Sequence, residues 1–258
     1  MNPLRPLSVP GYRPLYAAMV LTVFAQGAWA LYLAMQTLDL GATAATLSSV
    51  VAWSGIGLLA GSLPAGVLAD SVAKKSVIVG VLTVNLAAST TTSTAAIFDA
   101  ATFWMLAVSA FVIGVSTAFF FPAYTALVPV LVGSDDLMSV NGLEGTTRPL
   151  VGQTLAPGVV GAVIGASVPA TGGYLIAGAL GLALIAALRV PAPCSAETDA
   201  EAPATSALRD LLDGFGYVAR TRWVRSSVLL AAAMGLAVSG PLDVLLPALI
   251  RSTHDNGP

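Results

Sequence analysis

The chain has 258 residues, of which 56% are hydrophobic and only 9% are charged, and its formal net charge is −2. Soluble domains carry about 25% charged residues, so this composition excludes a soluble domain. We expect the lipid bilayer to be the main partner of the chain, and we expect no nucleic-acid partner.

Apolar segments long enough to span a membrane follow one another along the chain. A bilayer core of ~30 Å requires about 20 apolar residues in a helix. Strands of a membrane barrel alternate polar and apolar residues, and these segments do not. Since unpaired backbone groups are costly in lipid, we predict an all-α polytopic membrane protein. The predicted helices are roughly residues 14–36, 46–69, 76–97, 102–128, 145–165, 169–189 and 226–249.

The first segment has some features of a secretory signal peptide. Arg5 and Arg13 precede it, and Ala28-Trp29-Ala30 looks like a cleavage site. The apolar run continues to Met35, however, which is longer than a typical signal core. We therefore interpret this segment as a retained transmembrane helix.

The basic residues predict the orientation of the chain. With seven crossings, every lysine and arginine except Arg251 falls on one side of the membrane. Loops rich in these residues stay cytoplasmic, and the opposite loops carry Asp39 and Asp99. We predict a multi-pass protein of the cell membrane with a cytoplasmic N-terminus. The residues on the basic side are Arg5, Arg13, Lys74, Lys75, Arg148, Arg189, Arg209, Arg220, Arg222 and Arg225.

A polar linker over residues 190–225 separates the sixth predicted helix from the seventh. It contains three prolines and several acidic residues, a composition typical of loops. Within it, Leu208, Leu211, Leu212, Phe215 and Val218 recur at helical spacing. This pattern favours a short amphipathic helix on the membrane surface, and a flexible linker that carries leucines is the alternative. Residues 226–258 hold the seventh helix and a polar tail.

The connection between the second and third helices contains Gly66, Asp70, Lys74 and Lys75. A carboxylate at the C-terminal end of a helix is disfavoured by the helix dipole. Asp70 would be better placed facing the N-terminus of another helix or a guanidinium. Gly66 lies one turn earlier and allows a neighbouring helix to approach closely. This placement favours a functional role over an ordinary basic loop.

This stretch resembles the loop between helices 2 and 3 of the major facilitator superfamily, Gly-x-Leu-Ala-Asp-Arg-x-Gly-Arg/Lys-Arg/Lys. The matching residues are Gly66, Leu68, Ala69, Asp70, Lys74 and Lys75. Ser71 and Ala73 depart from the pattern, where the family usually has arginine and glycine. The resemblance implies a six-helix N-terminal bundle followed by the start of a second half. It also implies that the loop contacts helix 11 of that half and helps to hold the outward-facing state.

A second resemblance covers the fourth and fifth helices. Residues 122–129, with the sequence Pro-Ala-Tyr-Thr-Ala-Leu-Val-Pro, and the pair Asn141-Gly142 are similar to drug and siderophore exporters, including macrolide efflux and enterobactin export proteins. Glu144-Gly145, Arg148-Pro149 and Gln153 extend this likeness. It implies secondary-active export of a small amphiphilic substrate by alternating access.

Gly152, Pro157 and Gly161 partly match the antiporter motif of helix 5, in which two further glycines are Ala156 and Val160 here. A proline inside a helix removes a backbone donor and bends the helix. We therefore predict a functional kink at this point.

Glu144 and Arg148 are four residues apart and share a helix face. They are predicted at the cytoplasmic mouth of the fifth helix. Two interpretations stay open: a local ion pair at the interface, or a gate element near Asp70.

The predicted substrate pathway consists of polar and aromatic residues in the apolar segments. By depth, Gln26, Asn85 and Gln153 fall near the middle of the bilayer. In the resembled family, helices 1, 4 and 7 line the cavity, which favours Gln26, then Ser116 and Tyr124, over Asn85. Trp29 would contribute to an aromatic wall for an amphiphilic substrate. The predicted pathway residues are Gln26, Trp29, Ser116, Tyr124 and Gln153. The sequence has no carboxylate at the midplane that would couple transport to protons. We predict no catalytic residues, no metal and no cofactor.

The resembled family has twelve helices, so we expect a fragment or a part of a split transporter. A second polypeptide or a missing C-terminal half would supply helices 8–12, and we expect no transport without it. A non-transporting structural subunit is the alternative. A seven-helix receptor is opposed by the cytoplasmic N-terminus, and a retinal protein by the absence of a lysine in the seventh helix. An intramembrane enzyme is opposed by the position of Cys194 and His254 in polar segments.

Overall fold

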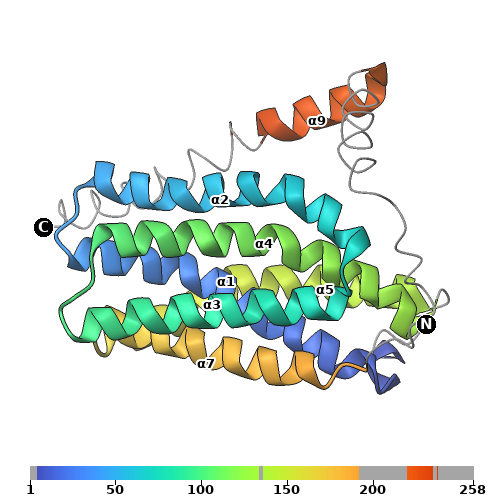
Figure 1. The fold of residues 1–258 in the computed structure, drawn as a ribbon, viewed down its shortest axis with the longest axis horizontal. Helices are drawn as coiled ribbons and strands as arrows, with labels where there is room; N and C mark the ends of the chain where they lie inside the picture. Colours follow the sequence, from blue (N-terminus) through green and yellow to red (C-terminus); the bar gives the residue numbers. More distant parts are fainter. Residues whose placement is uncertain (1–4, 134–135, 192–219, 235–236, 238–258) are drawn as a thin grey trace, which may run out of the picture. The chain divides into compact units, whose positions relative to one another are not determined.

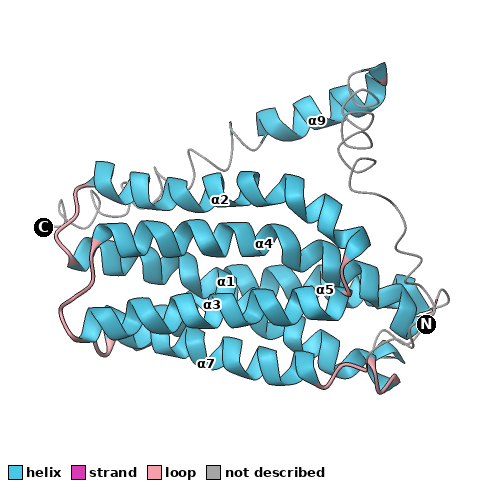
Figure 2. Cartoon of the chain, viewed as in Figure 1, coloured by secondary structure: helices cyan, strands magenta, loops and turns pink. Residues whose placement is uncertain are grey.

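The computed structural model describes residues 5–133, 136–191, 220–234 and 237, and within this part all regular structure is helical (Figure 2). The side chains of residues 63, 66–71 and 232 lie outside the description. The elements in chain order are η1 (Arg5–Ser8), α1 (Tyr12–Asp39), α2 (Ala44–Ser71), α3 (Lys74–Ile97), α4 (Phe103–Val132), α5 (Leu137–Pro149), η3 (Leu150–Leu155), α6 (Ala156–Gly165), α7 (Pro169–Leu188) and α9 (Arg222–Met234).

The chain divides into two units, residues 1–200 and 201–258. The first unit is a bundle built from η1 to α7, and the second contains α9. Five helices of the first unit are long and apolar enough to cross a membrane. The prediction of an all-α polytopic membrane protein is therefore confirmed.

Much of the segment after the linker lies outside the described residues. The part that the structure describes contains α9, which is rich in apolar residues over its second half. The predicted amphipathic helix near Leu208, the residue Cys194 and most of the predicted helix 226–249 fall on residues that the structure does not describe.

The fifth predicted helix begins earlier than expected. Helical backbone starts at Leu137 rather than at residue 145, and it continues through α5, η3 and α6 to Gly165. The first two turns mix apolar residues with Ser139, Asn141 and Glu144, which is why hydropathy placed the start too late. At about 1.5 Å per residue, this continuous helical run is about 40 Å long.

The segment η3 is a turn of π-helix inside this run. Pro157, which follows near the start of α6, has no N–H, and its ring would collide with the carbonyl group four residues earlier in an α-helix. A wider π-turn relieves this conflict, and such turns bend the helix that contains them. The structure thus has a π-turn on the N-terminal side of Pro157, and a functional kink there stays a prediction.

The helices of the first unit pack in a defined set of pairs. α2 lies along α4, while α1 and α3 both lie against α7, and α3 also packs on α4 (Figure 1). α1 further contacts η3 and α6. The large side chains of α1 are buried, including Tyr12, Leu15, Met19 and Tyr32, each 0% exposed. α1 is therefore the helix around which the bundle is assembled.

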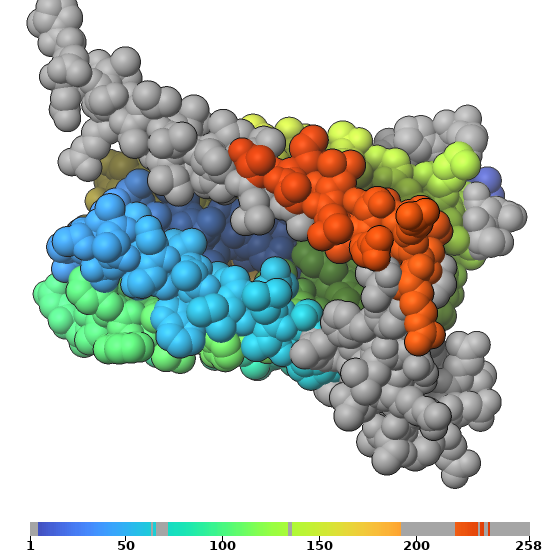
Figure 3. Space-filling view, turned by 90° about the horizontal axis from the view of Figure 1, so that it is seen from above, coloured from blue at the N-terminus to red at the C-terminus, as the bar shows by residue number. Residues whose placement is uncertain are grey.

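Glycines allow α2 and α4 to approach until their backbones touch. A methyl group on Gly57 would overlap the carbonyl oxygen of Phe111, and one on Gly114 would overlap that of Ser54. Small residues at such crossings are typical of membrane helix pairs, because lipid provides no hydrophobic drive for association. Figure 3 shows α2 in blue with the green atoms of the start of α4 beside it.

One end of the bundle collects its basic residues. Because successive helices run in opposite directions, this end holds the N-termini of α1, α3 and α5 and the C-termini of α2, α4 and α7. Arg5 forms an ion pair with Asp136 across it, at 3.4 Å. Asp39 and Asp99 lie at the connections of the opposite end. We refer to the former as the basic end.

We expect Gly114→Ala to lower the free energy of unfolding by about 1–3 kcal/mol, because the added methyl group must push α2 away from α4. Gly80→Ala in α3 is the matched control, since a methyl group there meets no atom within 4 Å. Denaturant unfolding of the purified chain in detergent measures both. Equal stability of the two variants would contradict the close α2–α4 contact.

Candidate functional site

A buried carboxylate on α5 is the centre of the most polar cluster in the first unit. Glu144 is 7% exposed. Its Oε1 accepts hydrogen bonds from the hydroxyl groups of Tyr12, at 3.1 Å, and Tyr124, at 2.5 Å. Its Oε2 accepts from Nη2 of Arg148 at 2.6 Å. The carboxylate thus joins α1, α4 and α5, and three donors satisfy its charge.

The guanidinium of Arg148 also contacts two aromatic rings. Its central carbon lies 4.8 Å from the ring centre of Phe121 and 5.4 Å from that of Tyr124. Such cation–π contacts strengthen when they are shielded from water, and the Arg148 side chain is 30% exposed. We call Tyr12, Tyr124, Glu144 and Arg148 the glutamate cluster.

Glu144 does not lie in the first turn of its helix. Since α5 begins at Leu137, Glu144 lies about 10 Å inside the helix at ~1.5 Å per residue. An unpaired charge at this depth is costly, which explains why every oxygen of the carboxylate has a donor. Glu144 and Arg148 do form a local ion pair between neighbouring turns of α5, at 2.6 Å. The alternative, a gate element near Asp70, stays a prediction, because the side chain of Asp70 lies outside the described residues.

The connection between α2 and α3 carries the residues of the first motif. Gly66 and Asp70 lie in the last turns of α2 (Ala44–Ser71), and their side chains are outside the description. Lys74 is the first residue of α3. The ammonium of Lys75 donates to the carbonyl oxygens of Leu188, at 3.0 Å, and Val190, at 2.6 Å. These carbonyls end α7, where the helix dipole attracts a cation.

The residues of the helix 5 motif meet α1. A methyl group on Gly27 would overlap the carbonyl oxygen of Gly152, and one on Gly152 would lie 2.9 Å from a methyl carbon of Val23. The π-turn and α1 therefore touch through their backbones. A methyl group on Gly161 would make an ordinary contact with Leu31, at 3.4 Å. Gly152 is thus the motif glycine that the packing requires.

The residues predicted to line a substrate pathway do not share one cavity. Gln26 donates to the hydroxyl of Thr117 at 3.4 Å, and Tyr124 belongs to the glutamate cluster. Trp29 is buried at 5% exposure. Gln153 lies on the exposed side of η3.

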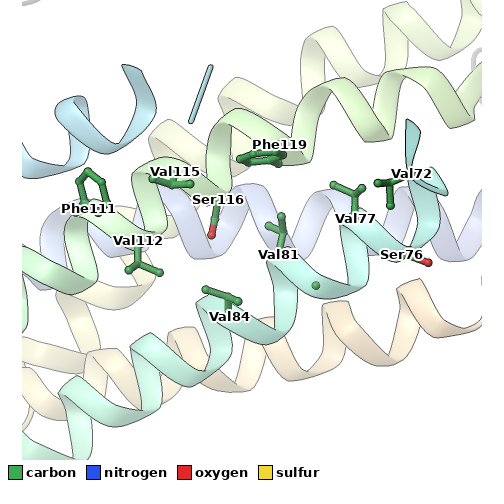
Figure 4. Close-up of a pocket in the computed structure, with 11 residues that line it drawn as sticks. Val72, Ser76, Val77, Val81, Val84, Phe111, Val112, Val115, Ser116 and Phe119 are labelled. Carbon is green, nitrogen blue, oxygen red and sulfur yellow. The ribbon is translucent and has the colours of Figure 1, made fainter. Parts of the chain in front are cut away.

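Ser116 lines a separate groove between α3 and α4. This groove has a volume of about 470 Å³ and is walled almost entirely by valine and phenylalanine side chains (Figure 4). In Figure 4 the hydroxyl of Ser116 points toward α3. A groove with this lining suits an apolar group, such as a lipid chain or an apolar side chain. It contains neither Gln153 nor a residue of the glutamate cluster.

Sequence reasoning missed the role of two residues. Tyr12 was not singled out, although a tyrosine at the start of an apolar segment can bring a hydroxyl group to a buried partner. Asn85 was set aside in favour of Gln26, yet both line the same small cavity with Trp29. No spacing rule relates these residues, because they lie on different helices.

We expect Glu144→Ala to destabilise the chain by about 3 kcal/mol or more, because Arg148 and two tyrosine hydroxyls lose their common partner inside the bundle. Asp136→Asn, which breaks the ion pair with the largely exposed Arg5, is the matched control and should cost about 0–1 kcal/mol. Denaturant unfolding in detergent compares them. An equal loss of unfolding free energy in the two variants would contradict a stabilising role for the glutamate cluster.

Lys75→Met should lower stability by about 1–2 kcal/mol, because two carbonyl groups at the end of α7 lose a charged donor. Lys74→Met is the control, since Lys74 makes no such bond within the described part of the chain. Thermal unfolding of the purified chain at low salt measures the difference. An effect of Lys74→Met as large as that of Lys75→Met would show that only the loop charge matters.

Three comparisons with known proteins bear on the identity of this bundle. A model of the Major Facilitator Superfamily matches residues 15–257. No curated protein and no solved structure matches the chain. The matched region covers nearly the whole chain, from the first turn of α1 onward, and includes the other four long apolar helices of the described residues in full. The chain therefore belongs to the major facilitator superfamily, whose members are membrane transporters rather than enzymes.

Proposed function

We propose that the chain serves secondary-active export of a small amphiphilic molecule, of the drug, macrolide or siderophore kind, by alternating access in the cell membrane. Membership of the family supports transport. The collection of basic residues at one end supports a cytoplasmic N-terminus. The likeness of residues 122–129 and of the Glu144–Gln153 region to exporters supports the direction.

The observation that carries this proposal is an exposed polar strip on the α5–η3–α6 run. Thr146, Gln153 and Thr154 are exposed, although they belong to a helix of membrane-spanning length. The hydroxyl of Thr146 donates to the carbonyl of Gly142 at 3.1 Å, but an amide that faces lipid has no partner there. A residue such as Gln153 in a membrane helix therefore usually faces a water-filled passage or other helices. The strip thus marks the side of the bundle that faces the transport pathway.

The same surface has an amphiphilic character. Leu150 and Leu155 are 50% and 48% exposed and flank Gln153 on η3. A surface that alternates an amide with leucines matches a substrate that has both polar and apolar groups. The π-turn places this surface at the bend of the helix, where a change in the bend would change its exposure.

A transport pathway between two bundles needs a second wall. In transporters of this type, the site lies at the interface of two repeats. We propose that further helices, on this or a second polypeptide, cover the strip at Gln153. The contact between the α2–α3 loop with Asp70 and those helices belongs to the same proposal.

The test is the water accessibility of position 153. In a Cys194→Ser background, we expect Gln153→Cys to react with a charged, water-soluble thiol reagent in membranes. Gly178→Cys is the matched control, because Gly178 is an exposed residue in the middle of α7 whose added side chain meets no atom within 4 Å. That control should stay unlabelled, since a charged reagent does not enter lipid.

A macrolide or another amphiphilic drug should slow the labelling of Gln153→Cys if the substrate class is correct. If position 153 is labelled and no amphiphile slows the labelling, the proposal of a water-filled passage stands and the proposed substrate class is rejected. Absence of labelling at position 153, with labelling of an exposed cysteine at position 5 as positive control, would reject the passage itself.

A further inference from the structure

A small cavity lies inside the bundle, midway along α1 and α3. It has a volume of about 10 Å³ and is lined by Gln26 and Trp29 of α1, Asn85 of α3, and apolar residues of α4 and α7. It is separate from the exposed strip at Gln153 and from the glutamate cluster. What it holds is therefore independent of the proposed function.

Two residues that line this cavity each carry a buried polar atom, and the two atoms have opposite hydrogen-bonding character. The indole Nε1–H of Trp29 and the side-chain oxygen Oδ1 of Asn85 have no hydrogen-bond partner among the described residues. Their residues are 5% and 2% exposed. An indole nitrogen donates and cannot accept, while an amide oxygen accepts and cannot donate. Leaving both unpaired in an apolar interior costs free energy.

We propose that this cavity is a binding site for one water molecule, which accepts from Nε1 of Trp29 and donates to Oδ1 of Asn85. A metal cation would be repelled by the indole N–H, and an anion by the amide oxygen. No charged side chain lines the cavity among the described residues. Water is the smallest molecule that both accepts and donates.

The size and the polarity of the cavity agree with this occupant. A water site requires a cavity of at least about 10–15 Å³ and two to four polar partners. The cavity is at the lower edge of this range, so it admits one water and excludes a transported substrate. The amide of Gln26 lines the same cavity and offers a third partner.

The water would connect helices that share few polar contacts. α1 and α3 both lie against α7, and the bridge adds a polar link between them near mid-membrane. Gln26 also donates to Thr117 of α4. The water and Gln26 together thus tie α1 to α3 and α4 at one level of the bundle.

Nuclear magnetic resonance of the full chain in lipid nanodiscs, with ¹⁵N-labelled tryptophan, tests the proposal. The chain has four tryptophans, and Trp53, Trp104 and Trp223 are exposed. We expect the indole proton of Trp29 to show a cross-relaxation peak to water with the sign of a bound molecule. The indole signal that disappears in Trp29→Phe is assigned to Trp29. If that variant does not fold, Trp→Phe substitutions at the three exposed positions assign the remaining indole signal to Trp29.

Asn85→Leu should abolish the water peak of Trp29, because the water loses its acceptor. Asn141→Leu, at an exposed asparagine of α5, should leave the peak unchanged. A Trp29 indole proton without a water peak in the unmodified chain would overturn the proposal whether or not the variants fold. A peak that persists in Asn85→Leu would overturn the bridging role.

Discussion

Inside a bilayer, a polar group without a hydrogen-bond partner is costly, and this constraint organises the whole bundle. It restricts the backbone to helices and dictates what surrounds each polar side chain. Glu144 receives donors from three helices, and serine and threonine hydroxyls of α3 bond to carbonyls one turn earlier. Lys75 turns to the open carbonyls of α7 for the same reason.

Close backbone contact supplies the packing that hydrophobic burial cannot supply in lipid. Where α2 crosses α4, and where α1 crosses the π-turn, glycine removes the side chain that would separate the helices. Dispersion contacts between backbones then hold the pair. The two crossings differ in consequence, because the second lies at the bend beside Pro157. The packing of α1 therefore determines which side of that bend is exposed.

Some of the candidate site followed from residue type and spacing. Glu144 and Arg148 belong to one helix face because they are four residues apart, and a proline inside a helical segment, such as Pro157, predicts a disturbed helix. The tyrosines that bind Glu144 did not follow, because Tyr12 is 132 positions away in the sequence. Nor did the separation of Ser116 from Gln153, since depth along a helix says nothing about the direction in which a side chain points.

The sequence by itself determined the class of the protein: long apolar segments in a chain with 9% charged residues allow only membrane helices, and the basic residues gather on one side. The hydropathy of each segment and the positions of the basic residues are local properties, so they can be read from short stretches of sequence. The tertiary structure decided that α5 starts at Leu137, that Lys75 caps α7, and that Trp29 and Asn85 meet at one cavity. These depend on which helices become neighbours and how each is rotated, which only the packing of the whole bundle specifies.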